Sequence, residues 1–191
     1  MPHVSRFAAA ALGLLLALGV PRAHATEMEH LDTQALVTAS NDIVIGEVES
    51  IQPHWNAGHT KIVTDVTVRV TQTLKGRGAD RLTLTQLGGE VDGVRYTIPG
   101  CPSFARGEEA LLFVWRDTRG QAQVNGLAQG KFDIVRDPAS GTATVQRSVP
   151  GLAVGDARQL RLVPQNQPAP RILLDDMVRE IRRAMGEEAG H

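Results

Sequence analysis

Cysteine is almost absent from this chain of 191 residues, which contains only Cys101. An internal disulfide needs two cysteines, so even an exported form of the chain must rely on a packed apolar core. Cys101 lies in the turn Pro99-Gly100-Cys101-Pro102, with no neighbouring base or cation that would activate its thiol. We expect an inert, partly buried side chain, and the alternative is a reactive or intermolecular thiol.

The sequence also has no concentration of positive charge. Its 20 Lys and Arg residues stand against 21 Asp and Glu, for a formal net charge of −1, and they are spread along the chain. Proteins that bind nucleic acid gather Lys and Arg on one face. This composition therefore argues against a nucleic-acid partner.

Catalytic signatures are missing as well. The sequence has no GxSxG elbow, HExxH pair or P-loop, and no GxGxxG follows a strand pattern. The carboxylates are scattered, so spacing alone selects no acid–base pair. We expect a non-catalytic protein without a cofactor; a hydrolase whose site assembles from distant residues is the third-ranked alternative.

Only one long hydrophobic run is present, at residues 7–20. It is too short to cross a bilayer, and it is followed by Ala23-His24-Ala25, the small-residue pattern of a signal peptidase site. Residues 1–25 are predicted to be a cleaved secretory signal, with an uncleaved membrane anchor as the alternative. The mature product would be secreted or periplasmic, with no transmembrane segment.

Period-2 alternation of apolar and polar residues marks a β-protein. It is clearest at residues 60–76, where Ile62, Val66 and Val68 share one face. Asp92-Gly93 is a two-residue hairpin signal, and Gly46 suggests a bulge. Further strands are predicted at residues 43–51, 81–87 (with a bulge before Gly88), 94–98, 110–115, 122–127, 131–136 and 142–147. No helix pattern separates these strands, which favours an antiparallel barrel or sandwich.

Helical patterns flank the strands. Asp32 can cap a short helix over residues 33–40, and residues 171–186 carry an amphipathic stripe that includes Met177 and Ile181. This second helix either packs on its own barrel, which we favour, or binds a partner or a membrane surface. The predicted organisation is a β-barrel domain at 26–148, a proline-containing linker at 149–170 and the C-terminal helix.

Three segments carry a family resemblance: Ile43-Val44-Ile45-Gly46-Glu47-Val48, the strand ending in Leu74-Lys75-Gly76, and the stretch from Phe104 through Gly107-Glu108 to Phe113. Their order resembles uncharacterised secreted bacterial barrel proteins and is similar to the netrin-like domain of tissue inhibitors of metalloproteinases. The resemblance implies a small OB-like barrel that binds another protein, in those inhibitors a protease. Their zinc-chelating N-terminal cysteine has no counterpart here, since the predicted mature terminus is Thr26.

Candidate binding residues fall in the polar stretch at residues 52–59 and in the turn at 88–93. The predicted partner-binding residues are Trp55, His54, Gly89 and Asp92. For Trp55 the alternative is a ring that folds over the barrel end. His54 and His59, with His30 as a third, are candidate zinc or copper ligands, against the alternative of a solvated loop. The preferred function is a secreted protein-binding module, with an extracellular metalloprotease as the first partner to consider, and the runner-up is a metal-binding envelope protein.

Overall fold

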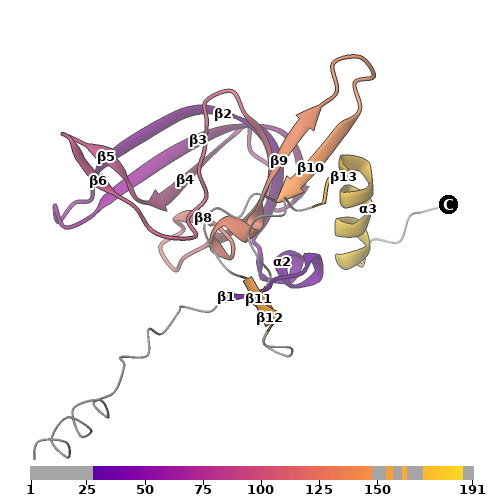
Figure 1. Cartoon of the computed structure of the whole chain (residues 1–191), viewed down its shortest axis with the longest axis horizontal. Helices are drawn as coiled ribbons and strands as arrows, with labels where there is room; N and C mark the ends of the chain where they lie inside the picture. Colours follow the sequence, from indigo (N-terminus) through magenta and orange to yellow (C-terminus); the bar gives the residue numbers. More distant parts are fainter. Residues whose placement is uncertain (1–27, 148–153, 157–160, 163–169, 187–191) are drawn as a thin grey trace, which may run out of the picture.

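The computed structural model describes residues 28–147, 154–156, 161–162 and 170–186. The predicted signal peptide and much of the predicted linker lie outside these residues. The fold is mainly β, as predicted, and centres on a five-stranded barrel (Figure 1). The barrel strands are β2 (Asp42–Trp55), β3 (Ile62–Lys75), β4 (Arg81–Leu87), β7 (Glu109–Arg116) and β8 (Ala122–Val124). In the described part of the chain, no helix is long and apolar enough to cross a membrane.

The barrel closes in the order β7-β2-β3-β4-β8 and back to β7. Four of the five contacts are antiparallel, while β4 and β8 meet in parallel at the single pair Leu84 and Ala122. A ring of this order, with the third and fifth strands parallel, is the topology of the OB fold. The predicted OB-like barrel is therefore confirmed, with one parallel contact added to its antiparallel pairing.

Apolar side chains fill the barrel in rows that follow the strand register. Val48, Val68 and Leu82 form one row, and the next contains Val66 and Leu84. Gly46 lies at a register shift between β2 and β3, which confirms the predicted bulge. A Cβ atom at Gly46 would lie only 2.5 Å from the carbonyl oxygen of Arg69, so the two backbones can approach this closely only at a glycine.

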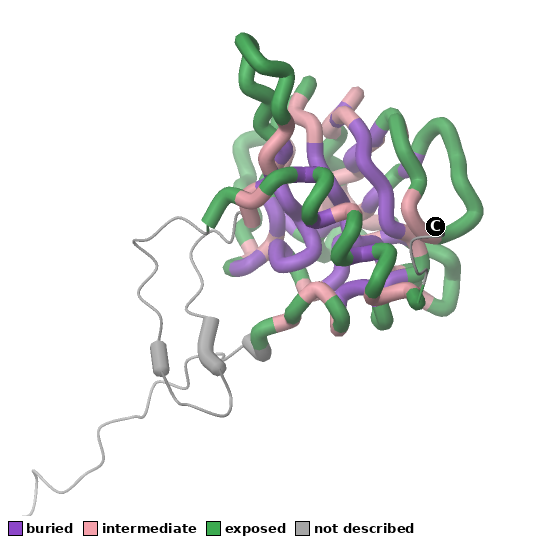
Figure 2. The backbone as a smooth tube through the Cα atoms, turned by 90° about the vertical axis from the view of Figure 1, so that its right-hand side faces the viewer, coloured by how far each residue is buried: buried purple, intermediate pink, exposed green. Residues whose placement is uncertain are grey.

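A second core lies outside the barrel, between its sheet and two helices (Figure 2). The sheet continues from β7 through β9 (Lys131–Arg136), β10 (Ala143–Arg147) and β13 (Ile172–Leu173). Helices α2 (Thr33–Ala39) and α3 (Leu174–Ala184) bury Leu36, Val37, Leu174, Met177 and Ile181 in this core. The start of β2 and most of β7 are therefore buried on both faces, which accounts for the continuous apolar runs in their sequences.

The C-terminal helix packs on its own domain, which is the alternative that we favoured. It begins at Leu174, later than the sequence period indicated, because Ile172 and Leu173 instead pair with β10. The predicted cap of α2 is also present: the Asp32 carboxylate accepts a hydrogen bond from the Ala35 backbone nitrogen at 2.7 Å.

One buried lysine pairs with two partly exposed carboxylates. Lys131 is only 3% exposed, and its Nζ lies 3.1 Å from Glu108 Oε1, in contact with Asp133, and over the Phe104 ring. Phe104 and Glu108 belong to the segment that carries the family resemblance. Their contacts with Lys131 show that this motif attaches the loop before β7 to the start of β9.

Four sequence expectations near strand ends were wrong. Residues 97–98, predicted to be strand, lie outside β6, which ends at Tyr96. Residues 52–55, predicted to be loop, belong to β2, which continues to Trp55 opposite β3. The ladder between β3 and β4 has no register shift, so the bulge expected before Gly88 is absent; Leu87 simply points to the outer face. Leu127, placed in a strand, begins the 3₁₀ helix η2 (Leu127–Gly130) after the left-handed Gly126.

Non-covalent contacts, and not a disulfide, hold the N-terminal segment against the rest of the domain. Leu31 donates its backbone N–H to Gln129 Oε1 at 2.8 Å and accepts a hydrogen bond from Arg147 at its carbonyl, at 3.0 Å. The Arg147 guanidinium also lies over the Phe132 ring. A separate three-stranded sheet consists of β1 (Met28–Glu29), β11 (Val154–Asp156) and β12 (Arg161–Leu162).

Candidate partner-binding site

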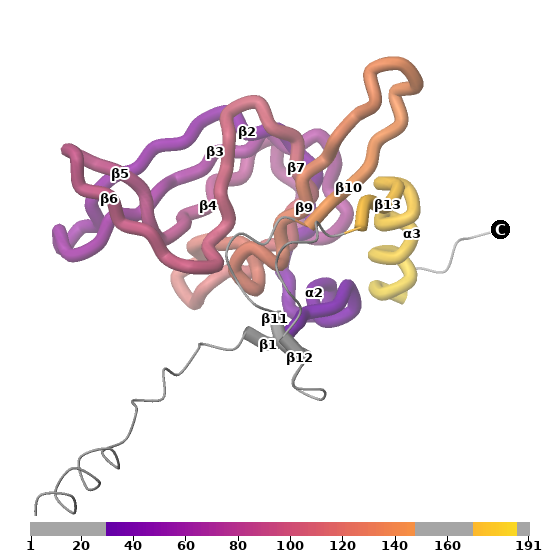
Figure 3. Tube along the Cα trace, in the orientation of Figure 1, coloured from indigo at the N-terminus to yellow at the C-terminus, as the bar shows by residue number. Residues whose placement is uncertain are grey.

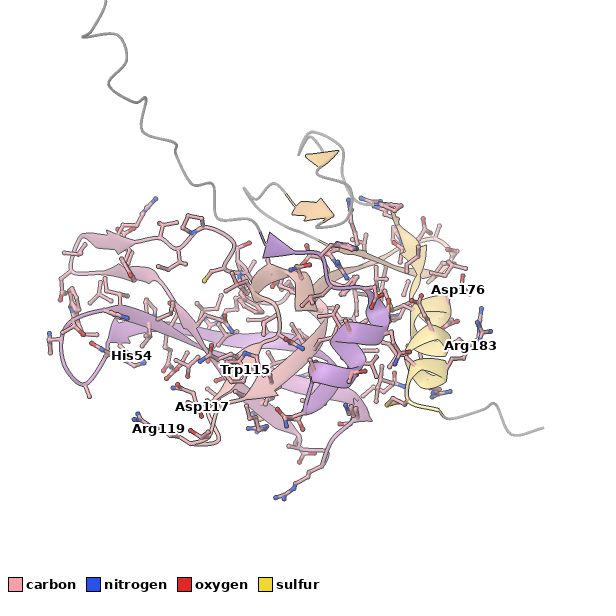
Figure 4. All side chains as sticks on the ribbon, turned by 90° about the horizontal axis from the view of Figure 1, so that it is seen from below. His54, Trp115, Asp117, Arg119, Asp176 and Arg183 are labelled. Atoms are coloured by element: carbon pink, nitrogen blue, oxygen red, sulfur yellow. The ribbon has the colours of Figure 1, made fainter. Side chains whose placement is uncertain are left out.

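Two strands reach past the closed part of the barrel and form an arm, which we define as residues 51–65 of β2, β3 and their turn. The ladder between β2 and β7 ends at Glu47 and Glu109. Among the described residues, no strand pairs with residues 51–55 on that side of β2. The arm carries His54, far from the α3 residues Asp176 and Arg183 (Figure 4).

The turn at the end of the arm is held by one amide side chain. Asn56 Oδ1 accepts backbone N–H groups from Thr60 at 2.8 Å and Lys61 at 3.1 Å, and its Nδ2 donates to the Thr60 hydroxyl. His59 adopts a positive φ of 52° within this turn. These local hydrogen bonds give the turn a defined shape, which holds the His59 ring against Trp55.

His54 and Trp55 point to opposite faces of the arm because they are successive residues of one strand. On the outer face, the ring nitrogens of His54 contact the Trp55 carbonyl at 2.9 Å and the Asp65 carboxylate at 3.1 Å. Both partners are acceptors, so the doubly protonated ring is favoured. These two contacts, the Trp55 carbonyl first and Asp65 second, raise the pKa of His54 above its usual value.

Trp55 lies on the inner face, opposite the fully buried Ile62, and is itself half-buried. The His59 ring stacks on the indole with centroids 5.6 Å apart and planes 20° apart. The indole is therefore fixed at the barrel end with part of its surface accessible. The indole packs at the barrel end, and its role in binding a partner stays a prediction.

The predicted metal ligands do not converge. His54 is engaged with Asp65 on the outer face, whereas His59 stacks on a side chain of the inner face. His30 precedes Leu31, whose contacts are with Gln129 and Arg147 instead of the arm. Within the described residues, no group of three or more His, Cys, Asp or Glu side chains is arranged to hold a metal ion.

A separate hairpin, β5 (Gly89–Val91) with β6 (Val94–Tyr96), crosses the end of the arm (Figure 3). Its two-residue turn is Asp92-Gly93, with φ of 51° and 76°, which confirms the predicted hairpin signal. Gly89 is where the hairpin meets the arm: a Cβ atom there would lie 2.6 Å from the Thr64 hydroxyl and 3.0 Å from Pro53 Cβ. Gly89 thus permits close packing, while Asp92 is at the exposed tip.

One face of this hairpin is turned toward the inner face of the arm. The register pairs Gly89 with Tyr96 and Val91 with Val94, so all four side-chain positions share the face that Gly89 presses against the arm. Val94 nevertheless remains 49% exposed and Tyr96 36% exposed. The Glu90–Arg95 ion pair, at 2.7 Å, occupies the opposite face.

Together these positions form what we call the mouth surface. It consists of Ile51, Pro53, Trp55, Thr64 and Gln86 from the arm and β4, and Val91, Val94 and Tyr96 from the hairpin. None of these side chains is charged, and several expose apolar atoms. Such a surface suits contact with an apolar or neutral segment of another molecule.

The sequence analysis predicted Trp55, Gly89 and Asp92 as binding residues at one end of the barrel. It did not identify Gln86, Val94 and Tyr96 as part of the same surface. The signal for Gln86 was present in the alternation of β4, where the inward positions read Leu82, Leu84 and then a polar residue.

Cys101 is half-buried, and burial raises the pKa of its thiol, in keeping with the inert side chain expected. No protein-family model matches the sequence, and no curated protein matches it.

Proposed function

We propose that this chain is a non-catalytic binding module that holds a segment of another protein on the mouth surface. The carrying observation is the half-exposed apolar face of the β5–β6 hairpin, where Val94 and Tyr96 face the arm and yet remain open to contact. Exposed apolar side chains that gather around an anchored aromatic residue are typical of interfaces. Trp55, fixed by His59, would supply that anchor.

An extracellular metalloprotease is the first partner to test, because the netrin-like resemblance points to that class. The amine-and-carbonyl chelation used by the animal inhibitors is not part of this proposal. Leu31 is held by hydrogen bonds to Gln129 and Arg147 and by packing of its side chain against the second core, and no cysteine stands at the predicted mature terminus. The mouth surface is instead the proposed contact.

The test uses protein that starts at Thr26, immobilised and offered to secreted zinc metalloproteases such as thermolysin, together with inhibition assays in solution. Val94→Ser should weaken retention by about 3- to 5-fold, the effect of losing roughly half of a valine contact. Val135→Ser is the matched control, since Val135 is 44% exposed but lies on β9, away from the arm.

Two results would count against the proposal separately. If no protease is retained or slowed, the choice of protease as partner is wrong. If a protein partner is found but Val94→Ser and Val135→Ser weaken it equally, the mouth surface is not the contact.

A further inference from the structure

The apolar filling of the barrel is interrupted at one row. Along β4 the inward positions are Leu82, Leu84 and Gln86, and Gln86 lies beside Thr64 of β3 and, across the arm, Pro53 of β2. Gln86 is only 7% exposed, so its side chain is buried at the barrel end, next to Thr64, on which Gly89 of the β5–β6 hairpin packs. A buried polar side chain therefore lies at the inner edge of the mouth surface.

The Gln86 amide has an unused donor. Its Nε2 atom is buried and has no hydrogen-bond partner among the residues that the structure describes. The Thr64 hydroxyl, its neighbour in the register, already donates to the Gly88 carbonyl at 2.7 Å. A buried N–H group without an acceptor costs free energy, which an incoming acceptor would recover.

The surroundings select a neutral acceptor. A carboxylate or phosphate buried here would need a cation beside it, and no side chain of the mouth surface is charged. His54 and Asp65, the nearest ionisable pair of the arm, are on its outer face. The backbone carbonyl of a peptide meets the requirement, and the side chains of the same peptide would contact Trp55 and Val94.

Because Nε2 is buried, a ligand reaches it only if a neighbouring segment moves, and the β5–β6 hairpin directly follows β4 in the chain. The base of the hairpin is fixed by the bond from the Gly88 N–H to the Ile62 carbonyl, at 3.0 Å. Gly88 and Gly89 have φ of 103° and 138°, values that glycine adopts readily. Rotation at these two residues is the movement that peptide entry would require.

We infer that Gln86 is a specificity-determining residue that donates a hydrogen bond from Nε2 to a backbone carbonyl of a peptide bound on the mouth surface. This inference rests on the proposed function and adds the chemistry of recognition to it. The hairpin acts as a cover over the donor and is displaced when the peptide enters.

The probe is N-methylacetamide, which is a single peptide group, with acetate as the charged comparison. In ¹⁵N-labelled protein, the Gln86 side-chain amide and the backbone amides of Thr64 and Gly89 should shift and saturate with N-methylacetamide but not with acetate. The exposed Gln72 side chain is the internal control and should show no saturation. In Gln86→Leu the shifts at Thr64 and Gly89 should be lost, while resistance to urea stays equal or increases.

Several outcomes overturn the inference. These are an absence of saturation at Gln86, equal shifts at Thr64 and Gly89 in Gln86→Leu, or a lasting contact between the amide and one water molecule that the probe does not displace. A protein partner that is sensitive to Val94→Ser but unaffected by Gln86→Leu would preserve the proposed function and remove this inference alone.

Discussion

Replacing the buried lysine is the sharpest test of how the barrel is held together. Lys131 Nζ lies 3.1 Å from Glu108 Oε1 and also contacts Asp133. Two unit charges at that distance attract by about 5 kcal/mol at an effective dielectric constant of about 20. The cost of removing the ammonium group from water offsets much of this attraction, so the net contribution of the pair is smaller.

Lys131→Met keeps most of the aliphatic stem and removes the charge. Loss of one partner from a fully buried pair costs roughly 3 to 5 kcal/mol. Here the carboxylates keep some contact with water, because the Glu108 and Asp133 side chains are 24% and 39% exposed. We therefore expect a loss of about 2 to 3 kcal/mol in the free energy of unfolding, below the fully buried range.

The measurement is urea unfolding at neutral pH, with an unchanged dependence on urea to show that the two-state comparison holds. Lys61→Met is the control, since Lys61 is exposed at the turn of the arm, and it should change stability by less than about 0.5 kcal/mol. Adding Glu108→Gln to Lys131→Met should restore part of the loss by removing one of the two uncompensated carboxylates. A loss below about 0.5 kcal/mol in the single variant would refute the reasoning.

Further predictions concern the arm and the bulge. An NMR titration of His54 should give a midpoint above its ordinary pKa of about 6.5, and Asp65→Asn should lower it only in part because the Trp55 carbonyl is the larger cause. Because this pKa is raised on folding, the contribution of His54 to stability is complete at acid pH and falls as pH rises through the folded value; a midpoint at or below 6.5 would contradict this. Gly46→Ala should cost about 2 to 3 kcal/mol in unfolding free energy, since its Cβ would meet the Arg69 carbonyl, and near-normal stability would show that the strands can separate there. Zinc titration followed by calorimetry should be the same for the wild type and for a His54→Ala, His59→Ala variant, and heat lost in the variant would mean that the two rings do converge.

The Gly107-Glu108 turn before β7 shows how a sequence pattern and a structural role can be connected. Glu108, in the Gly-Glu turn of the resemblance, pairs with Lys131, which lies 23 residues later in the chain. Neither residue shows a periodic signal that would predict the pairing. The motif could be recognised from the sequence, but its role in joining β7 to β9 required the structure.

The sequence by itself determined the local elements of this protein. Alternation placed β3 and β4, a continuous apolar run placed β7, Asp92-Gly93 placed a hairpin turn, and Asp32 capped a helix, because each depends on residues that are neighbours in the chain. Only the tertiary structure decided which strands pair, that β4 and β8 meet in parallel, and that helices cover a second core. It also placed His54 and His59 on opposite faces of the arm and buried the polar Gln86 side chain at the barrel end. These features depend on how side chains distant in sequence share space around a closed sheet, which local spacing does not specify.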